Sequence, residues 1–203
     1  MDLQVTKVDK AYATSESLNN KTVKTSTEIS QDMERVLNNM KAHWKGEDAT
    51  LHINEWIDKY DKLGDYFTEL NKTTNHLQNY FVNLQVCRSR VTVNPKVGDV
   101  TSEKHDFNPI STIDTTEEYY FDEKLLDDFK ELQEISKKYD SFVDDVDNNM
   151  NEVFQNWKIG IGRDEVGKYY QRIENFSRKL SSEIHAQNDK LETVIHNIEK
   201  INK

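Results

Sequence analysis

The side chains that most often carry out chemistry are present in this chain, but their spacing does not suit a catalytic or metal site. None of the six histidines forms a His-x-x-x-His pair with a third ligand nearby. The paired carboxylates at 127–128 and 144–145 lack the glycine-punctuated loop of a calcium site, and no glycine-rich phosphate loop is present. Cys87 is the single cysteine, so an intramolecular disulfide is excluded. We expect no metal, no cofactor and no enzymatic activity.

Net charge and hydropathy bear on whether the protein could bind nucleic acid or span a membrane. The net charge is −10 over 203 residues, and no basic stripe interrupts the acidic composition. Such a surface repels phosphate backbones, so a nucleic-acid partner is not expected. No stretch approaches the roughly 18 apolar residues of a membrane span, and the first residues lack the basic and apolar regions of a cleaved signal peptide. We therefore expect no membrane span and no Sec-type leader.

The two prolines, Pro95 and Pro109, fall in one window that separates two proline-free stretches. This window is rich in Ser and Thr, and its run at 90–94 is expected to form at most a short strand. Loops of this length are uncommon inside compact domains. The sequence therefore predicts a first unit at 1–86, a linker at 87–121 and a second unit at 122–203.

Outside the linker, apolar residues recur every three or four positions, which is the heptad spacing of helices that pack along a seam. The pattern predicts long helices near 9–43, 47–86, 122–156 and 163–201. The apolar positions that carry it include Ile29, Met33, Leu37, Met40, Trp56, Tyr60, Leu63, Phe67, Leu77, Phe81, Phe129, Leu132, Tyr139, Val143, Val146, Met150, Ile173, Leu180, Ile184, Leu191 and Ile198.

The two halves also repeat each other. Placing Trp44 on Trp157 aligns Met33 with Val146 and continues the apolar pattern in both directions. We expect an all-α fold in which two tandem helical hairpins form a four-helix bundle. Because one chain supplies all four helices, a monomeric pseudo-dimer is favoured over a homodimer.

The turn of the first predicted hairpin contains Trp44 and Gly46, a Trp-x-Gly triplet at the break between two long amphipathic helices. Gly46 suits the chain reversal, and the acidic residues after it suit the start of a helix. This arrangement resembles the WXG family of helical-hairpin substrates of type VII secretion, typified by the early secreted antigenic target proteins. The second turn, with Trp157 and Gly160, resembles a divergent copy because its spacing is longer.

The resemblance implies that the turn residues Trp44, Gly46, Trp157 and Gly160 take part in recognition by the export machinery. The alternative is that the two tryptophans only pack at the ends of the hairpins. Family members complete the export signal with a Tyr-x-x-x-Asp/Glu element after a hairpin. Tyr119 and Glu123, at the exit of the linker, are the best candidates here, whereas further matches at 12–16 and 170–174 lie within predicted helices.

The resemblance implies a non-enzymatic substrate or chaperone-like accessory partner of a type VII secretion system. Its expected partners are the secretion machinery and a larger secreted toxin or another helical WXG-like protein. Export without a leader would place it outside the cell or on the cell surface, with a cytoplasmic pool before export. The Asn- and Lys-rich composition suits a Gram-positive bacterium of low GC content. The alternative is an acidic helical immunity or adaptor protein that stays in the cytoplasm.

Overall fold

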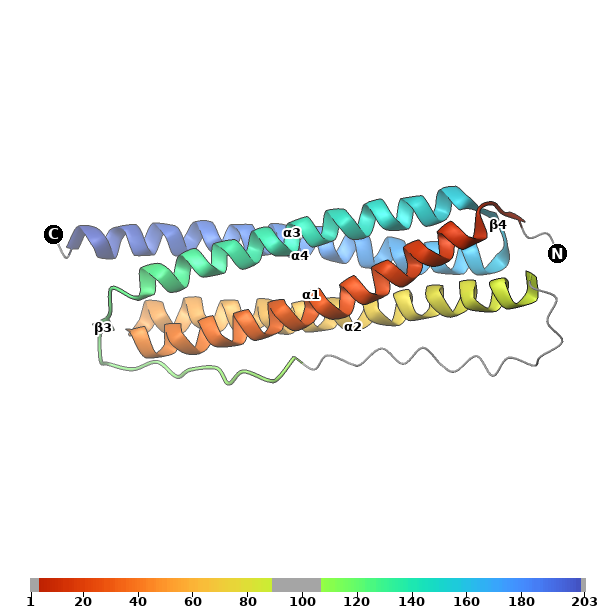
Figure 1. Ribbon diagram of the computed structural model, residues 1–203. Helices are drawn as coiled ribbons and strands as arrows, with labels where there is room; N and C mark the ends of the chain where they lie inside the picture. The colour runs from red at the N-terminus through yellow and green to blue at the C-terminus, as the bar shows by residue number, and fades with distance from the viewer. Residues whose placement is uncertain (1–3, 89–106, 202–203) are drawn as a thin grey trace. The chain divides into compact units, whose positions relative to one another are not determined.

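The computed structural model describes residues 4–88 and 107–201, and it confirms an all-α fold in which four long helices form a four-helix bundle (Figure 1). Four short strands accompany the helices within these residues. In chain order, the elements are β1 (Gln4–Val5), α1 (Val8–His43), β2 (Trp44–Lys45), α2 (Glu47–Arg88), β3 (Tyr120–Phe121), α3 (Leu125–Asn156), β4 (Trp157–Ile159) and α4 (Ile161–Ile201). The extended run expected at 90–94 lies outside the described residues.

Local signals explain where the helices begin. Asp122 caps α3, because its carboxylate accepts a hydrogen bond from the Lys124 backbone amide at 2.9 Å. The α-helical pattern therefore begins at Leu125, slightly later than the expected start at 122. In α1, by contrast, Asp9 lies inside the first turn, and the carbonyl of Lys7 accepts the first amide hydrogen bonds of the helix. Acidic residues also occupy the first turns of α2 and α4, where the helix dipole favours them.

The described residues fall into two compact units, and each unit takes segments from all four helices. We name the two units after Trp157 and Trp44, the tryptophans of the two hairpin turns. The Trp157 unit contains residues 4–26, 66–88 and 142–177, and the Trp44 unit contains residues 27–65, 107–141 and 178–201. Each predicted hairpin thus contributes to both units. The linker at 87–121, with one hairpin before it and one after it, remains a prediction from the sequence, because the two compact units are divided along the helices instead.

Aromatic packing dominates the core of the Trp157 unit. Trp157 is fully buried, and Tyr80 stacks on it with ring centroids 4.3 Å apart, while Phe81 meets it edge-on at 5.4 Å. A second aromatic group joins α2 to α3 through Phe67 and Phe142. Rings of this size bury large apolar areas, so they supply much of the stabilisation of this unit.

Polar side chains also enter the core of the Trp157 unit. Asn19 of α1 donates to Gln78 of α2 at 2.7 Å and accepts from the Thr74 hydroxyl at 2.9 Å. All three residues are buried. Because an amide at a seam position must find its partner, this group fixes how α1 aligns with α2.

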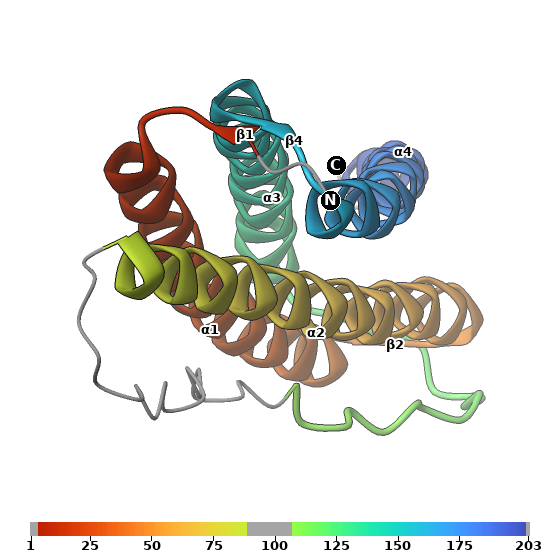
Figure 2. The same ribbon diagram turned by 90° about the vertical axis from the view of Figure 1, so that its right-hand side faces the viewer.

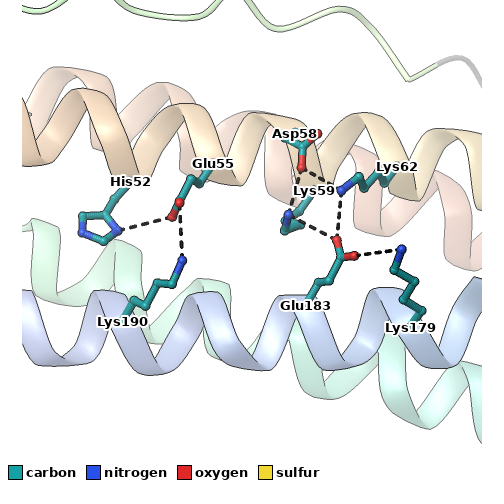
Figure 3. Close-up of polar contacts among 8 residues, drawn as sticks. All are labelled: His52, Glu55, Asp58, Lys59, Lys62, Lys179, Glu183 and Lys190. Carbon is teal, nitrogen blue, oxygen red and sulfur yellow. Dashed lines mark hydrogen bonds and ion pairs between the residues drawn. The ribbon is translucent and has the colours of Figure 1, made fainter.

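An ion-pair cluster joins α2 to α4 in the Trp44 unit (Figure 3). The Glu183 carboxylate lies 2.9 Å from the Lys62 amine and 3.3 Å from the Lys59 amine. Asp58 contacts the same two lysines from α2, at 2.8 Å and 3.0 Å. The hydrogen bond from Lys62 holds the pKa of Glu183 below its usual range, and the bond from Lys59 does the same for Asp58.

The lowered pKa of Glu183 makes a pH-dependent prediction. The ionised carboxylate stabilises the fold at neutral pH, and this contribution is lost as the pH falls through the lowered pKa. Glu183→Gln should reduce the free energy of unfolding at pH 7 by less than about 1 kcal/mol, because the cluster is partly exposed to solvent. The difference from the unchanged protein should shrink as the pH falls into the acid range.

Chemical denaturation across this pH range measures the effect. Glu192→Gln is the matched control, since Glu192 is an exposed carboxylate of the same helix and the substitution changes the net charge equally. A loss for Glu183→Gln that matches the control, or that persists unchanged in acid, would contradict the assignment.

Candidate functional site

The first hairpin turn is built on a buried tryptophan and a glycine with an unusual backbone. Trp44 is 1% exposed and directly follows α1. Gly46 has a φ of +123°, a conformation that L side chains rarely adopt. Its carbonyl accepts the backbone amide of Thr50 at 3.0 Å, which starts the hydrogen-bond ladder of α2. The triplet therefore reverses the chain while Trp44 stays in the core.

A distant segment pairs with this turn. Strand β3 lies antiparallel to β2, with Trp44 opposite Phe121 and Lys45 opposite Tyr120. The Asp122 amide donates to the carbonyl of His43 at 2.8 Å and extends the pairing by one residue. The segment before α3 thus forms a two-stranded ribbon with the turn between α1 and α2.

Tyr119 packs directly on the glycine of the turn. A Cβ atom built on Gly46 would lie 3.1 Å from Cδ2 of the Tyr119 ring, so the glycine leaves room for the ring. Tyr119 is nevertheless 65% exposed, and Glu118 beside it pairs with Lys45 at 2.9 Å. The structure therefore brings Gly46 and Tyr119 into one surface, next to the buried Trp44. We call this group, together with the β2–β3 ribbon, the Trp44 surface.

The structure places Glu123 next to this surface but outside the ribbon. It is exposed, between the helix cap Asp122 and the start of α3, and its carbonyl accepts the Leu126 amide at 3.1 Å. Tyr119 and Glu123 thus stand at opposite ends of the short stretch that leads from the ribbon into α3.

An aromatic contact and a polar contact on the inner side of the turn support the Trp44 surface. The Trp44 ring stacks on His52, with centroids 6.0 Å apart and planes 12° from parallel. Burial lowers the pKa of His52, which favours a neutral ring against the tryptophan. His43 contacts Asp128 of α3 through Nδ1 and Oδ2 at 2.6 Å. Sequence spacing gives no signal of this contact, because His43 and Asp128 meet only through tertiary packing.

The second turn also forms a two-stranded ribbon, and its partner is the segment before α1. Strand β4 pairs with β1 (Figure 2), and the Thr6 amide donates to the carbonyl of Asn156 at 2.7 Å. Gly160 has a φ of +151° and ends the ribbon before α4. Each hairpin turn thus pairs with the segment that precedes the first helix of the other hairpin.

The surroundings of Trp157 differ from those of Trp44. Arg163 Nε donates to the Trp157 carbonyl at 2.6 Å, and its guanidinium lies 5.4 Å from the centre of the Phe154 ring. The tight glycine contact is made by Gly162, where a Cβ atom would lie 3.2 Å from Cε2 of Tyr80 and 3.3 Å from Cζ2 of the buried Trp157.

The other two Tyr-x-x-x-Glu matches are engaged within the Trp157 unit. The Tyr12 hydroxyl donates to Glu16 at 3.0 Å along α1. Tyr170 is buried, and its hydroxyl donates to Asp147 of α3 rather than to Glu174. The bond of Tyr12 stays within α1 and that of Tyr170 joins α4 to α3, whereas Tyr119 is exposed at a hairpin turn.

The described residues contain no group of three or more His, Cys, Asp or Glu side chains that could hold a metal ion. Within the helices of residues 4–88 and 107–201, none is long and apolar enough to cross a membrane. What the Trp44 surface offers is an exposed tyrosine, a backbone ribbon and an ion pair on a buried tryptophan. This combination suits recognition by another protein.

The contact between Gly46 and Tyr119 leads to a prediction on stability. Gly46→Ala should lower the free energy of unfolding by about 1–3 kcal/mol, because it combines a strained backbone with a clash against the ring. Gly167→Ala is the control, since nothing lies within 4 Å of the added Cβ in α4 and alanine should stabilise the helix by roughly 0.5–1 kcal/mol. Urea denaturation of both variants tests this, and equal stabilities would contradict the geometry.

No family model, no curated protein and no solved structure matches the chain. The contacts of the chain's own residues are therefore the evidence that bears on its function. The most specific of these is the packing of Tyr119 on Gly46, next to the buried Trp44.

Proposed function

We propose that the protein acts by binding, as a substrate or chaperone-like accessory partner of a type VII secretion system. The observation that carries the proposal is the Trp44 surface. Gly46 of the Trp-x-Gly triplet and Tyr119 of the Tyr-x-x-x-Glu element are 73 residues apart in sequence, yet Tyr119 packs on Gly46. Packing of the helices alone does not require an exposed tyrosine at this position.

The chemistry of the surface supports a role in recognition. The buried Trp44 fixes the turn, and the ribbon presents Tyr119 and Tyr120, which are 65% and 42% exposed. Exposed tyrosines provide rigid contact area with a polar end, and they are enriched where proteins bind one another. The surface is thus preorganised, so a partner would bind it without first ordering a loop.

The proposal also says which partners the protein would bind and where it would be found. The secretion machinery would recognise the Trp44 surface, and a larger toxin or another helical WXG-like protein would bind along the helices. The protein would be exported without a leader, or displayed on the cell surface, from a cytoplasmic pool. It would travel as a monomeric pseudo-dimer, because one chain supplies helices from both hairpins to each compact unit. The competing reading is a cytoplasmic immunity or adaptor protein.

Conservative substitution of the two tryptophans separates recognition from packing. Trp44→Phe keeps most of the buried area, so we expect it to remain folded but to reduce secretion by about tenfold or more. Trp157→Phe is the matched control, since its turn has the longer spacing and should be the weaker recognition point. The measurement is secreted against intracellular protein in a host with an active exporter, alongside thermal unfolding.

Normal secretion of a stably folded Trp44→Phe variant would leave Trp44 as a packing residue alone. Equal retention of the unchanged protein in the cell pellet of an exporter mutant and its parent would instead favour the cytoplasmic reading.

Tyr119→Ala tests the contribution of the exposed tyrosine to the Trp44 surface. Because Tyr119 is largely exposed, its removal should change thermal stability little and reduce secretion by about tenfold or more. Tyr169→Ala removes a tyrosine of similar exposure, 60%, from α4, and should leave secretion unchanged. If both variants are secreted normally, Tyr119 has no role in recognition.

A further inference from the structure

An extended segment lies along α1 and α2 in the Trp44 unit. Residues 107–114 belong to no helix or strand, and they run beside the two helices as the green trace in Figure 1. We call this segment the strap. Side chains of the helices, rather than a neighbouring strand, hold its backbone.

The central contact is made by one asparagine. Asn54 of α2 donates from Nδ2 to the carbonyl of Ile113 at 2.9 Å, and its Oδ1 accepts the Ile113 amide at 2.9 Å. An amide side chain that satisfies both backbone groups of one residue recognises an extended chain whatever its side chain is. Asn54 therefore fixes the position of the strap without selecting its sequence.

Two further side chains continue this backbone recognition. The Lys41 amine of α1 donates to the carbonyl of Ser111 at 2.6 Å. The Thr50 hydroxyl of α2 lies 3.4 Å from the carbonyl of Asp114. The backbone is thus contacted at three residues near one end of the strap, from both helices of the hairpin.

The other end of the strap is anchored by an aromatic side chain. Phe107 lies over Gly64 of α2, where a Cβ atom would approach the Phe107 Cβ and Cγ to 3.1 Å. Its ring meets that of the buried Tyr60 with centroids 5.1 Å apart. Gly64 is a glycine inside a helix, which is unfavourable for the helix itself, and its absent side chain makes the notch that Phe107 fills.

These contacts form a receptor for an extended chain: a notch for an aromatic ring and, six residues further on, a side chain that pairs with the backbone. We propose that this face of α1 and α2 is a docking groove for an extended segment of a partner protein, and that the strap occupies it within the chain. The required segment carries an aromatic residue at the notch and free backbone groups six residues later. This proposal is independent of secretion.

The strap has the features of an exchangeable occupant. Its side chains at 108, 109, 111 and 112 are exposed, and Phe107 and Ile113 are only half-buried. The backbone contacts of Lys41 and Thr50 are exposed to solvent. A tethered segment competes through its high effective concentration rather than through tight contacts. The strap is also continuous with β3 of the same unit, which keeps it on its own chain and disfavours exchange between two copies.

Weakening the strap should open the groove to a peptide added in solution. The probe is a fluorescein-labelled peptide with the sequence of residues 107–116, and fluorescence anisotropy measures its binding to the purified full chain. Phe107→Ala should bind the peptide at least about tenfold more tightly than the unchanged protein, because the notch is no longer filled from within. A peptide with alanine in place of its phenylalanine should bind at least about tenfold more weakly than the probe.

Second substitutions in the Phe107→Ala background identify the groove. Asn54→Ala removes the backbone contact, and Gly64→Ala fills the notch while favouring the helix, so each should abolish the gain in binding. Asn197→Ala, at an exposed position of α4, is the control and should leave binding unchanged. Circular dichroism establishes that each variant is folded.

Failure of the folded Phe107→Ala variant to bind the peptide would overturn the proposal. Binding that survives both Asn54→Ala and Gly64→Ala would also overturn it, because the peptide would then bind elsewhere. Dimerisation of Phe107→Ala by light scattering in the absence of peptide would assign the groove to a second copy and overturn the partner assignment.

Discussion

A pair of amphipathic helices covers only part of the apolar stripe that each helix carries, and the remaining part must be buried by something else. In this chain the second hairpin provides that cover, so each compact unit draws on all four helices. The aromatic rings around Trp157 and the ion pairs around Glu183 both lie where segments of different hairpins meet. The turns and their ribbons, which also join segments of different hairpins, are positioned by this shared packing.

Buried amides set the register between the two helices of each hairpin. In the Trp157 unit Asn19 joins α1 to α2, and in the Trp44 unit Asn188 of α4 donates to Ser136 of α3 at 2.9 Å. Apolar seams tolerate sliding by a heptad, whereas a buried amide without its partner loses a hydrogen bond that water can no longer supply. A buried amide in a long helix takes the place of an apolar side chain, so the helix pair loses some apolar burial. In return, the two helices can pair in only one register.

The helices and the two tryptophan turns could be predicted from the sequence, because heptad spacing and glycine at a chain reversal are local signals. Tyr119 was recognised as a candidate, but its contact with Gly46 was not, since the ribbon joins segments far apart in the chain. The strap was missed because its backbone is held by side chains. A weak signal for it did exist: Gly64 lies inside a helix, where glycine is unfavourable, and Phe107 fills the space that its missing side chain leaves.

The pairing of the N-terminal segment with the second turn has a consequence for the order of events during synthesis. Thr6 and Asn156 are 150 residues apart in sequence, yet they share a hydrogen bond. At roughly 5–20 residues per second, the ribosome needs on the order of ten to thirty seconds to make the intervening chain. The first strand is therefore made well before its partner, which it can meet only after the third helix is complete. Translation speed thus sets the earliest moment at which that ribbon can close.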